Sequence, residues 1–301
     1  MRSTLLAFAV FTFATGCNEP AASAPESGAL GIAAWNIEHL AAENGMGCAP
    51  RDDAGYARVA AVIDEVQADI WLLQEIENEA ALARVFDPDA WSFHIEARPA
   101  GEPSGYPLCR GRDDGTRLTM QSTAIVVRNT VSHEAAAPLH ALDVEGQDRL
   151  RWGVSITLTG GTPIDIMSVH LKSGCFSGDG ASACPVFFDQ IPVLENWIDE
   201  RSAAGRGVIV GGDFNRRLEI EGDSVWLDLN DGDPTPLRLA GDGIGPQCNP
   251  RYTEFIDFIV LNDEAARQKI DGSFFETTFS GAREHHPSDH CPIAVDLIWP
   301  G

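Results

Sequence analysis

A polar segment in the second half of the chain places an acid and an amide two residues apart. It reads Gly-Val-Ile-Val-Gly-Gly-Asp-Phe-Asn and ends in Asp213 and Asn215. Its apolar part predicts a strand over 207–211, and the two glycines would let the backbone turn tightly where the strand ends. In an extended stretch both polar side chains point the same way, so one could accept a proton or orient water while the other donates a hydrogen bond. The alternative is a turn held by the Asp and Asn side chains.

A second polar motif, Ser288-Asp289-His290, lies near the end of the chain and precedes a predicted strand. Neighbouring residues of an extended segment face opposite ways, so we expect Asp289 and His290 not to pair with each other. Asp289 suits a hard cation, which prefers oxygen ligands. His290 then needs another carboxylate to orient its ring, and Asp257 in an apolar stretch is the candidate, because an isolated acid there needs a partner. The alternative is a surface Asp-His pair and a capped Asp257.

Polar residues also follow three other apolar, strand-like segments. Asn36, Glu75 and His170 each stand where such a segment ends, as Asp213 does. In α/β sheets, ligand crevices form at strand ends. Asn36, Glu75 and Asp289 together would make an oxygen-ligand set for Mg²⁺. Each of these residues could instead be a cap, a loop residue or a solvated strand end.

The elements that would position these residues are mainly strands. Apolar residues at helical spacing predict helices over 54–66 and 186–202, with a shorter helix over 79–85, and Pro192 is expected to start or kink the second one. Strands are expected over 31–37, 69–73, 91–97, 122–128, 151–158, 164–170, 207–211, 255–261 and 292–298. Strands outnumber helices and their spacing is mixed, which favours a layered α/β architecture.

Taken in order, these motifs resemble those of the endonuclease/exonuclease/phosphatase superfamily, the DNase I-like group. The motifs are Trp-Asn-Ile-Glu, Leu-Leu-Gln-Glu, Ser-Val-His-Leu-Lys-Ser, Gly-Asp-Phe-Asn, Ile-Asp-Phe-Ile and Ser-Asp-His, and they cover about residues 31–298. The resemblance implies a four-layer α/β sandwich of two mixed β-sheets flanked by helices. It also implies a divalent-metal-dependent phosphoesterase.

The resemblance implies a role for each matching residue. Glu75, with Asn36 and Asp289, would hold Mg²⁺, Mn²⁺ or Ca²⁺, and Asp213 would orient or deprotonate the attacking water. The phosphoryl oxygens would receive hydrogen bonds from Asn215 and His170. His290, oriented by Asp257, would stabilise the transition state or act as an acid, and no covalent intermediate is required.

The first residues of the chain are typical of an export signal. Arg2 precedes an apolar run over 5–13 that is too short to span a bilayer. Small residues then precede Cys17, which resembles a bacterial lipoprotein signal whose cysteine is lipidated; the alternative is an ordinary signal peptide. Residues 18–30 are expected to form a flexible tether, because they contain few large apolar side chains, and 31–301 a single domain. We therefore expect an exported bacterial protein, a periplasmic or cell-surface lipoprotein or otherwise a secreted one, which a lipid anchor would tie to the membrane.

The six cysteines after Cys17 indicate disulfides, because an even set in an exported chain is typical of them. The best pair is Cys175 with Cys184, which share a Gly- and Ser-rich segment. Cys48 with Cys109 and Cys248 with Cys291 complete one of the possible connectivities. Metal binding by these cysteines is the alternative, although no CxxC pair is present.

The substrate is the least defined part of the prediction. The formal net charge of −24 counts against a protein that coats DNA or RNA, although bound cations can reverse the field at a nuclease site. Nucleic acid is the first expectation, because exported enzymes of this superfamily commonly degrade it, but few aromatic residues lie near the motifs. A phospholipid or a small phosphate ester is the alternative, and a non-catalytic surface binding lipoprotein is another. The basic residues that could contact phosphate are Lys172, Arg216, Arg217 and Arg251, with Arg110, Arg112 and Arg117 as a further rim.

Overall fold

The computed structural model describes residues 28–299, which form two six-stranded sheets. The signal over 1–17, Cys17 and most of the tether therefore lie outside the described residues. The first sheet has the order β11-β12-β1-β2-β4-β3 and the second the order β5-β6-β7-β8-β10-β9. The strands are β1 (Ala29–Leu40), β2 (Ile70–Ile76), β3 (Trp91–Ile95), β4 (Ser122–Arg128), β5 (His133–Ala135), β6 (Val154–Leu158), β7 (Ile164–His170), β8 (Gly207–Asp213), β9 (Leu237–Leu239), β10 (Asp257–Asn262), β11 (Phe275–Glu276) and β12 (Ile293–Ile298).

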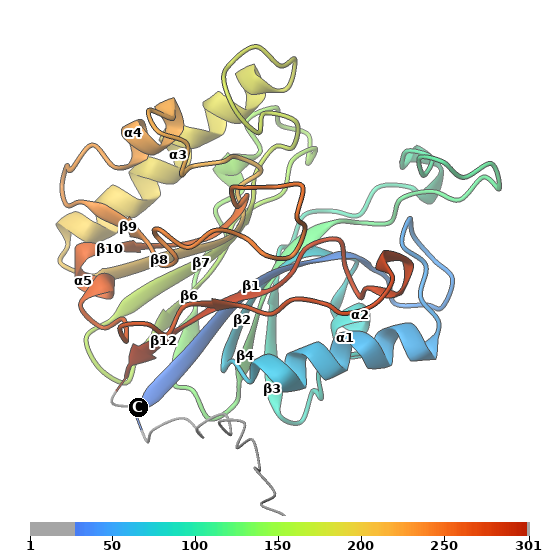
Figure 1. Cartoon of the computed structure of the whole chain (residues 1–301), viewed down its shortest axis with the longest axis horizontal. Coiled ribbons are helices and arrows are strands. Elements are labelled where there is room, and N and C mark those ends of the chain that lie inside the picture. Colours follow the sequence, from blue (N-terminus) through green and yellow to red (C-terminus); the bar gives the residue numbers. More distant parts are fainter. Residues whose placement is uncertain (1–27, 300–301) are drawn as a thin grey trace, which may run out of the picture.

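Helices cover the outer face of each sheet, which gives four layers (Figure 1). The helix α1 (Asp53–Val66) packs its apolar face on the first sheet, near α2 (Glu79–Leu82). The second sheet is covered by α3 (Cys184–Ala203), with α4 (Ser224–Leu229) and α5 (Asp263–Ala266) beside it. Short 3₁₀ helices span Pro103–Gly105, His140–Leu142 and Arg283–His285. The predicted α/β sandwich of two mixed sheets is confirmed.

The two sheets share one core because their central strands are apolar on both faces. In β1, Ile32 and Ala34 enter the core between the sheets, while Ala33 and Trp35 pack under α1 with Trp71. Strands that are buried on both faces have nearly continuous apolar sequences. This arrangement explains why the predicted strands lack a simple polar–apolar alternation.

Each sheet has one parallel strand pair at its centre, and the other neighbours are antiparallel. The pairs are β1 with β2 and β7 with β8. Parallel neighbours end at the same edge, and antiparallel β10 and β12 begin there. The ends of four strands and the starts of two others therefore meet at one rim of the sandwich.

The end of β8 differs from its prediction. The strand runs through Gly211 and Gly212 to Asp213, so the glycines lie inside the strand rather than in a turn after it. A Cβ at Gly211 would overlap Leu72 of the opposite sheet, and one at Gly212 would overlap the Val169 carbonyl. The two glycines therefore permit close packing of backbone at the point where the sheets approach each other.

The helix α3 also differs from its prediction, since it begins at Cys184 and continues through Pro192. Three short strands (β5, β9 and β11) and two short helices (α4 and α5) had no clear sequence signal. Among residues 28–299, no helix combines the length and apolarity that a membrane span needs.

Three disulfides join the cysteines in the expected pairs, Cys48–Cys109, Cys175–Cys184 and Cys248–Cys291. All six thiols are therefore oxidised, and the alternative of a cysteine metal site is wrong. The first bridge ties the segment after β1 to the loop between β3 and β4, which projects from the body of the molecule (Figure 1). The other two tie loops next to the rim where the strand ends meet.

Candidate active site

Asp213, the last residue of β8, lies at the centre of the polar residues on this rim. Its Oδ2 atom accepts a hydrogen bond from Asn36 Nδ2 at 3.1 Å, which crosses from one sheet to the other. The same oxygen lies 3.4 Å from His170 Nε2 and 3.9 Å from His290 Nε2. Burial, and then the charge of Asp257, raise the pKa of Asp213 to about 7. A buried carboxylate thus faces three nitrogen-bearing side chains from separate strands and loops.

Asn215 reaches the site by a different backbone path from the one predicted. Its φ is 53°, so the segment is not extended, and the Asp213 and Asn215 side chains are not parallel neighbours on a strand. The Asn215 backbone N–H donates to Asp213 Oδ1 at 2.8 Å, and its Nδ2 donates to the Leu171 carbonyl at 3.2 Å. The turn alternative therefore describes the local geometry, and this turn fixes the Asp213 carboxylate.

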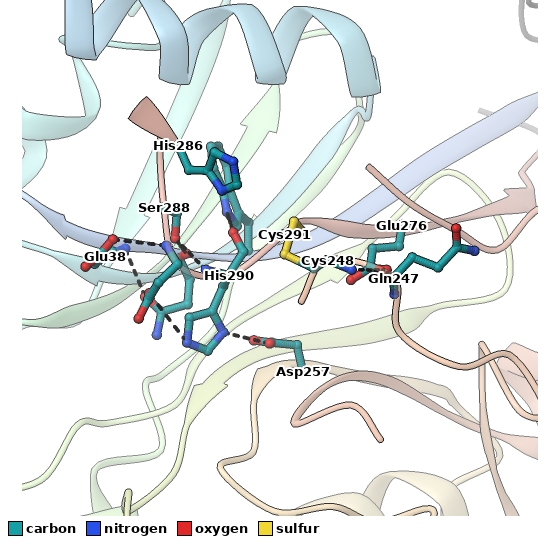
Figure 2. The surroundings of a disulfide bond; sticks show 12 residues. Glu38, Gln247, Cys248, Asp257, Glu276, His286, Ser288, His290 and Cys291 are labelled. Atoms are coloured by element: carbon teal, nitrogen blue, oxygen red, sulfur yellow. Dashed lines mark hydrogen bonds and ion pairs between the residues drawn. A yellow bond between two sulfur atoms is a disulfide. The ribbon is translucent and has the colours of Figure 1, made fainter. Parts of the chain in front are cut away.

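His290 pairs with Asp257, as predicted. Its Nδ1 atom lies 2.7 Å from Asp257 Oδ2 (Figure 2). Burial acts to lower the pKa of His290, but the charge and hydrogen bond of Asp257, together with Asp213, outweigh it and raise that pKa well above its ordinary value. This pairing leaves Nε2 of the ring on the side of Asp213. Asp257 therefore orients the imidazole toward the centre of the site.

The Ser-Asp-His segment is attached to β1 by hydrogen bonds rather than by strand pairing. Trp35 Nε1 donates to the His290 carbonyl at 2.8 Å, and Ser288 Oγ donates to the Asn36 carbonyl at 2.7 Å. Because the segment is not a strand, the expected alternation does not apply, and Asp289 Oδ1 lies 3.9 Å from His290 Nε2. That distance is beyond hydrogen-bond length, so the two side chains remain unbonded.

Two carboxylates at this rim, Glu38 and the predicted metal ligand Glu75, stand on irregular strands. The pairing of β1 with β2 shifts between Asn36 and Leu40, and that of β2 with β4 shifts between Leu73 and Ile76. Glu38 and Glu75 lie in these bulges with φ values of 54° and 64°. Bulges redirect side chains at sheet rims, and left-handed non-glycine residues are concentrated at functional sites. The backbone is thus shaped to aim carboxylates at the rim.

Glu38 is a member of the site that the sequence analysis did not assign. Its Oε2 accepts from the Asp289 backbone N–H at 3.0 Å. Burial, then the charge of Asp289 and further that of Glu75, raise the pKa of Glu38 to about 7, although Arg51 opposes them. The signal lay in Trp-Asn-Ile-Glu, where Glu38 follows Asn36 by two residues, but the bulge that presents it is not visible in the sequence.

These oxygen donors fit a divalent cation. Glu38 interacts unfavourably with Asp289 and Glu75, and a bound cation would remove that repulsion. Carboxylate and amide oxygens from Glu38, Glu75, Asp289 and Asn36 are the ligand types that Mg²⁺, Mn²⁺ and Ca²⁺ prefer. Among the described residues, the two clusters whose ligand atoms all lie within 4.8 Å of one another are Asp213 with Asp257 and His290, and Cys248 with Glu276 and Cys291; Glu38, Glu75 and Asp289 do not form a third. The first is already joined by its own hydrogen bond, and the cysteines of the second form a disulfide.

Replacing Glu38 by Gln should weaken metal binding. The change removes one negative charge beside Asp289 and keeps the side-chain volume, so we expect the Mg²⁺ concentration for half-maximal activity to rise about tenfold. Metal titration of activity measures this, with Glu43→Gln as the matched control, because Glu43 is exposed on the loop that follows β1. An unchanged titration midpoint would exclude Glu38 from the cation site.

Arg151 is a second residue that the sequence analysis missed. Its guanidinium donates to the carbonyls of His170 and Leu171 at 3.2 and 2.8 Å. Burial lowers the pKa of Arg151, while Glu75 and Asp213 act to raise it. His170 is buried, and its pKa is lowered well below the ordinary value, first by burial and then by the charge of Arg151. Its Nδ1 has no hydrogen-bond partner among residues 28–299.

The basic residues expected to contact phosphate differ in their position relative to the cleft beside the site. Arg217 lines a cleft of about 350 Å³ that also contains Asn215, Asp257 and His290. Arg216 does not face the cleft, because it is buried and forms an ion pair with Asp223; its expected phosphate contact is wrong.

The other basic candidates lie outside this cleft. The Lys172 ammonium donates to the Ser173 carbonyl, and Arg251 is exposed on the loop before β10. On the projecting loop, Arg112 pairs with Asp114 and Arg117 donates to the Tyr106 carbonyl, while Arg110 is exposed. Arg283 lines the cleft and was not predicted.

Comparison with solved structures agrees with the fold. The structure resembles truncated TDP2 from Caenorhabditis elegans (18% identity, TM-score 0.59, covering 91% of this chain and 99% of that one). It also resembles the AP endonuclease LMAP from Leishmania major (13%, 0.59, 91% and 89%) and the human Nocturnin catalytic domain with bound sulfate (14%, 0.56, 89% and 93%). At such identities the likeness concerns the fold. No curated protein matches the sequence.

A model of the endonuclease/exonuclease/phosphatase family matches residues 33–300, which is nearly the whole region the structure describes. The matched region includes the site residues from Asn36 to His290. The chain therefore belongs to the endonuclease/exonuclease/phosphatase family, whose members hydrolyse phosphoester bonds.

Proposed function

We propose that this chain is a divalent-metal-dependent phosphodiesterase whose substrate is nucleic acid. The observation that carries the proposal is the position of the Asp213 carboxylate. It contacts Asn36 and lies near both His170 and His290, and His290 Nε2 lies 3.9 Å from the Asp289 carboxylate as well. A proton acceptor, hydrogen-bond donors and hard oxygen ligands thus adjoin one cleft, as phosphoester hydrolysis requires.

The chain's own residues divide the reaction between them. Asp213 orients the attacking water and accepts its proton, because its carboxylate is fixed by Asn36 and by the Asn215 backbone. His170 and the Asn215 amide donate hydrogen bonds to the phosphoryl oxygens. His290, held by Asp257, stabilises the charge that develops on phosphate or donates a proton to the leaving oxygen.

The cation would be held by Asn36, Glu75 and Asp289, with Glu38 beside them. When bound, it neutralises phosphate charge and stabilises the developing oxyanion. Repulsion among the carboxylates supports a cation at this position, and Mg²⁺ is the first candidate, with Mn²⁺ or Ca²⁺ as alternatives.

Two observations support nucleic acid as the substrate: the name of one structural neighbour and the basic residues of the cleft. One structural neighbour is named an AP endonuclease, and Arg217 and Arg283 line the cleft beside the catalytic residues. The net charge of −24 gives no long-range attraction for a polyanion, so binding must depend on local contacts. A phospholipid or a small phosphate ester is the competing substrate.

The test compares substrates with and without metal. Purified protein should cleave plasmid DNA, single-stranded oligonucleotides or RNA in the presence of Mg²⁺, and EDTA should abolish cleavage until excess Mg²⁺ is restored. Activity that survives EDTA would overturn the role of the cation. Turnover of phosphatidylcholine without turnover of any nucleic acid would overturn the substrate. No turnover of any ester with Mg²⁺, Mn²⁺ or Ca²⁺ would favour the non-catalytic binding lipoprotein.

We propose further that the protein is exported and anchored through Cys17. The three disulfides support an oxidising compartment, because such bridges are rare in reducing cytosol. Mass spectrometry of the mature N-terminus from the native host tests the anchor. A lipid-modified Cys17 is expected, and an unmodified start beyond Cys17 would contradict the proposal.

A further inference from the structure

Two exposed aromatic residues that are distant in the sequence lie beside the catalytic residues. Phe176 and Tyr252 line the same cleft as Asn215 and His290. Their exposed fractions are 39% and 51%, so each ring leaves much of its surface open to solvent. Large exposed rings at the mouth of a reaction cleft contribute little to folding and are available to a ligand.

A guanidinium group lies near both rings. Arg217 Cζ is 5.7 Å from the Phe176 ring centroid and 5.8 Å from that of Tyr252. The Arg217 side chain also lies 3.7 Å from Glu254. We call Phe176, Arg217 and Tyr252 the aromatic platform. It combines two flat apolar surfaces with one positive charge.

The loop that carries Phe176 is fixed by a disulfide and by a buried arginine. Phe176 follows Cys175, which is bridged to Cys184. The buried guanidinium of Arg216 donates to the Cys175 carbonyl at 3.2 Å and forms an ion pair with Asp223 at 2.6 Å. Arg216 therefore supports the loop that presents Phe176, rather than meeting phosphate itself.

The loop that carries Tyr252 is also fixed. Cys248 is bridged to Cys291, the residue that follows His290 (Figure 2). The Cys248 backbone N–H donates to Glu276 Oε2 at 3.2 Å, and the Tyr252 N–H donates to the Asn249 carbonyl at 3.0 Å. Rings on restrained loops lose less conformational entropy when a ligand binds, so a preformed platform binds more tightly.

We infer that the aromatic platform binds an unpaired nucleotide next to the phosphodiester in the active site, an inference that rests on the proposed function. A base stacks on the ring of Phe176 or Tyr252, and Arg217 contacts the adjacent backbone phosphate. Every nucleobase has a π-face, so this contact tolerates any sequence. In a duplex those faces are covered by neighbouring bases. The enzyme should therefore bind single strands, or locally open duplexes, in preference to intact double helix.

Stacking also explains how a strongly acidic protein can hold a polyanion. With a net charge of −24, the chain gains nothing from long-range electrostatics. Local stacking does not depend on the overall field, and Arg217 and Arg283 supply positive charge inside the cleft. The same platform would be a poor match for an anionic membrane, because the long-range repulsion remains and a flat bilayer offers no base to stack.

A binding experiment without turnover tests the platform. An Asp213→Asn chain is titrated into a single-stranded oligonucleotide that carries 2-aminopurine, whose fluorescence is quenched by stacking. We expect quenching, and a Kd about tenfold higher when Tyr252→Ala or Phe176→Ala is added, the effect of losing one stacked base. Tyr252→Phe keeps the ring and should keep the affinity. Leu227→Ala is the control, because Leu227 is an exposed apolar residue on α4.

The outcomes separate the platform from the proposed function. Unchanged Kd and quenching in both alanine variants would overturn the platform even if the enzyme cleaves DNA. Conversely, if the enzyme fails to hydrolyse any diester, quenching that depends on Tyr252 still supports the platform. Loss of phosphatidylcholine-vesicle binding in those variants, with unchanged oligonucleotide binding, would assign the platform to a membrane.

Discussion

Replacing Asp213 by Asn should lower kcat for phosphodiester hydrolysis by about a thousandfold, within the range of about 10²–10⁴ that a positioned acid–base group supplies. The amide has nearly the same size but cannot accept a proton from water. It can still fill the space that faces Asn36 and His170, so the fold should remain intact. Steady-state kinetics with an oligonucleotide measures the effect, and circular dichroism verifies the fold.

The matched control for this change is Asp165→Asn. Asp165 is a buried carboxylate on the neighbouring strand β7, but it lies near the opposite end of the sheet and pairs with Arg206. Its replacement should reduce stability and leave kcat of the folded enzyme nearly unchanged. Near-normal kcat in Asp213→Asn would remove Asp213 from the chemistry, and an equal loss in Asp165→Asn would show that the effect comes from folding.

Replacing His290 by Asn should lower kcat/KM by roughly 10³-fold, an effect similar to that of Asp213→Asn, because it removes the oriented imidazole. The sharper expectation concerns Asp257. Its carboxylate lies 2.7 Å from His290 Nδ1 and acts on the reaction through that ring. Asp257→Asn alone should therefore lower kcat/KM. In the double variant with His290→Asn, it should lower kcat/KM little further.

A double-mutant cycle on kcat/KM measures this dependence. His286→Asn is the control, since that half-buried ring lies outside the catalytic cluster, with its Nε2 3.3 Å from the Gly281 carbonyl. Fully additive losses in the double variant would show that Asp257 acts independently of His290. A full loss in His286→Asn would indicate a general disturbance of the segment.

Much of the fold could be predicted because short apolar segments of the sequence indicate which strands are buried. The strands 122–128 and 164–170 have the predicted bounds, since each is built around a short apolar run. The strand expected over 151–158 begins at Val154 instead. Arg151 lies outside it because its guanidinium binds carbonyls at the end of β7, a requirement set by the folded site.

The chemistry of the site was easier to predict than its shape. Asp257 was assigned to His290 from one argument, that an acid in an apolar strand needs a partner, and the structure pairs them. The bulges at Glu38 and Glu75 had no comparable signal, because left-handed backbone at these residues is imposed by contacts from other strands. Arg216 shows the same limit, since its partner Asp223 becomes close only in the folded chain.

The topology that brings strand ends to one rim also affects how the molecule folds. Trp35 donates to the His290 carbonyl, and Ser288 donates to the Asn36 carbonyl, so residues from the two ends of the domain support the same site. Contacts between such distant residues carry a large loop-closure entropy and tend to form late, which slows folding. A partly folded chain can contain either sheet and still lack the site. Catalytic activity is therefore a measure of complete folding, and a truncation at either end of the domain would remove it.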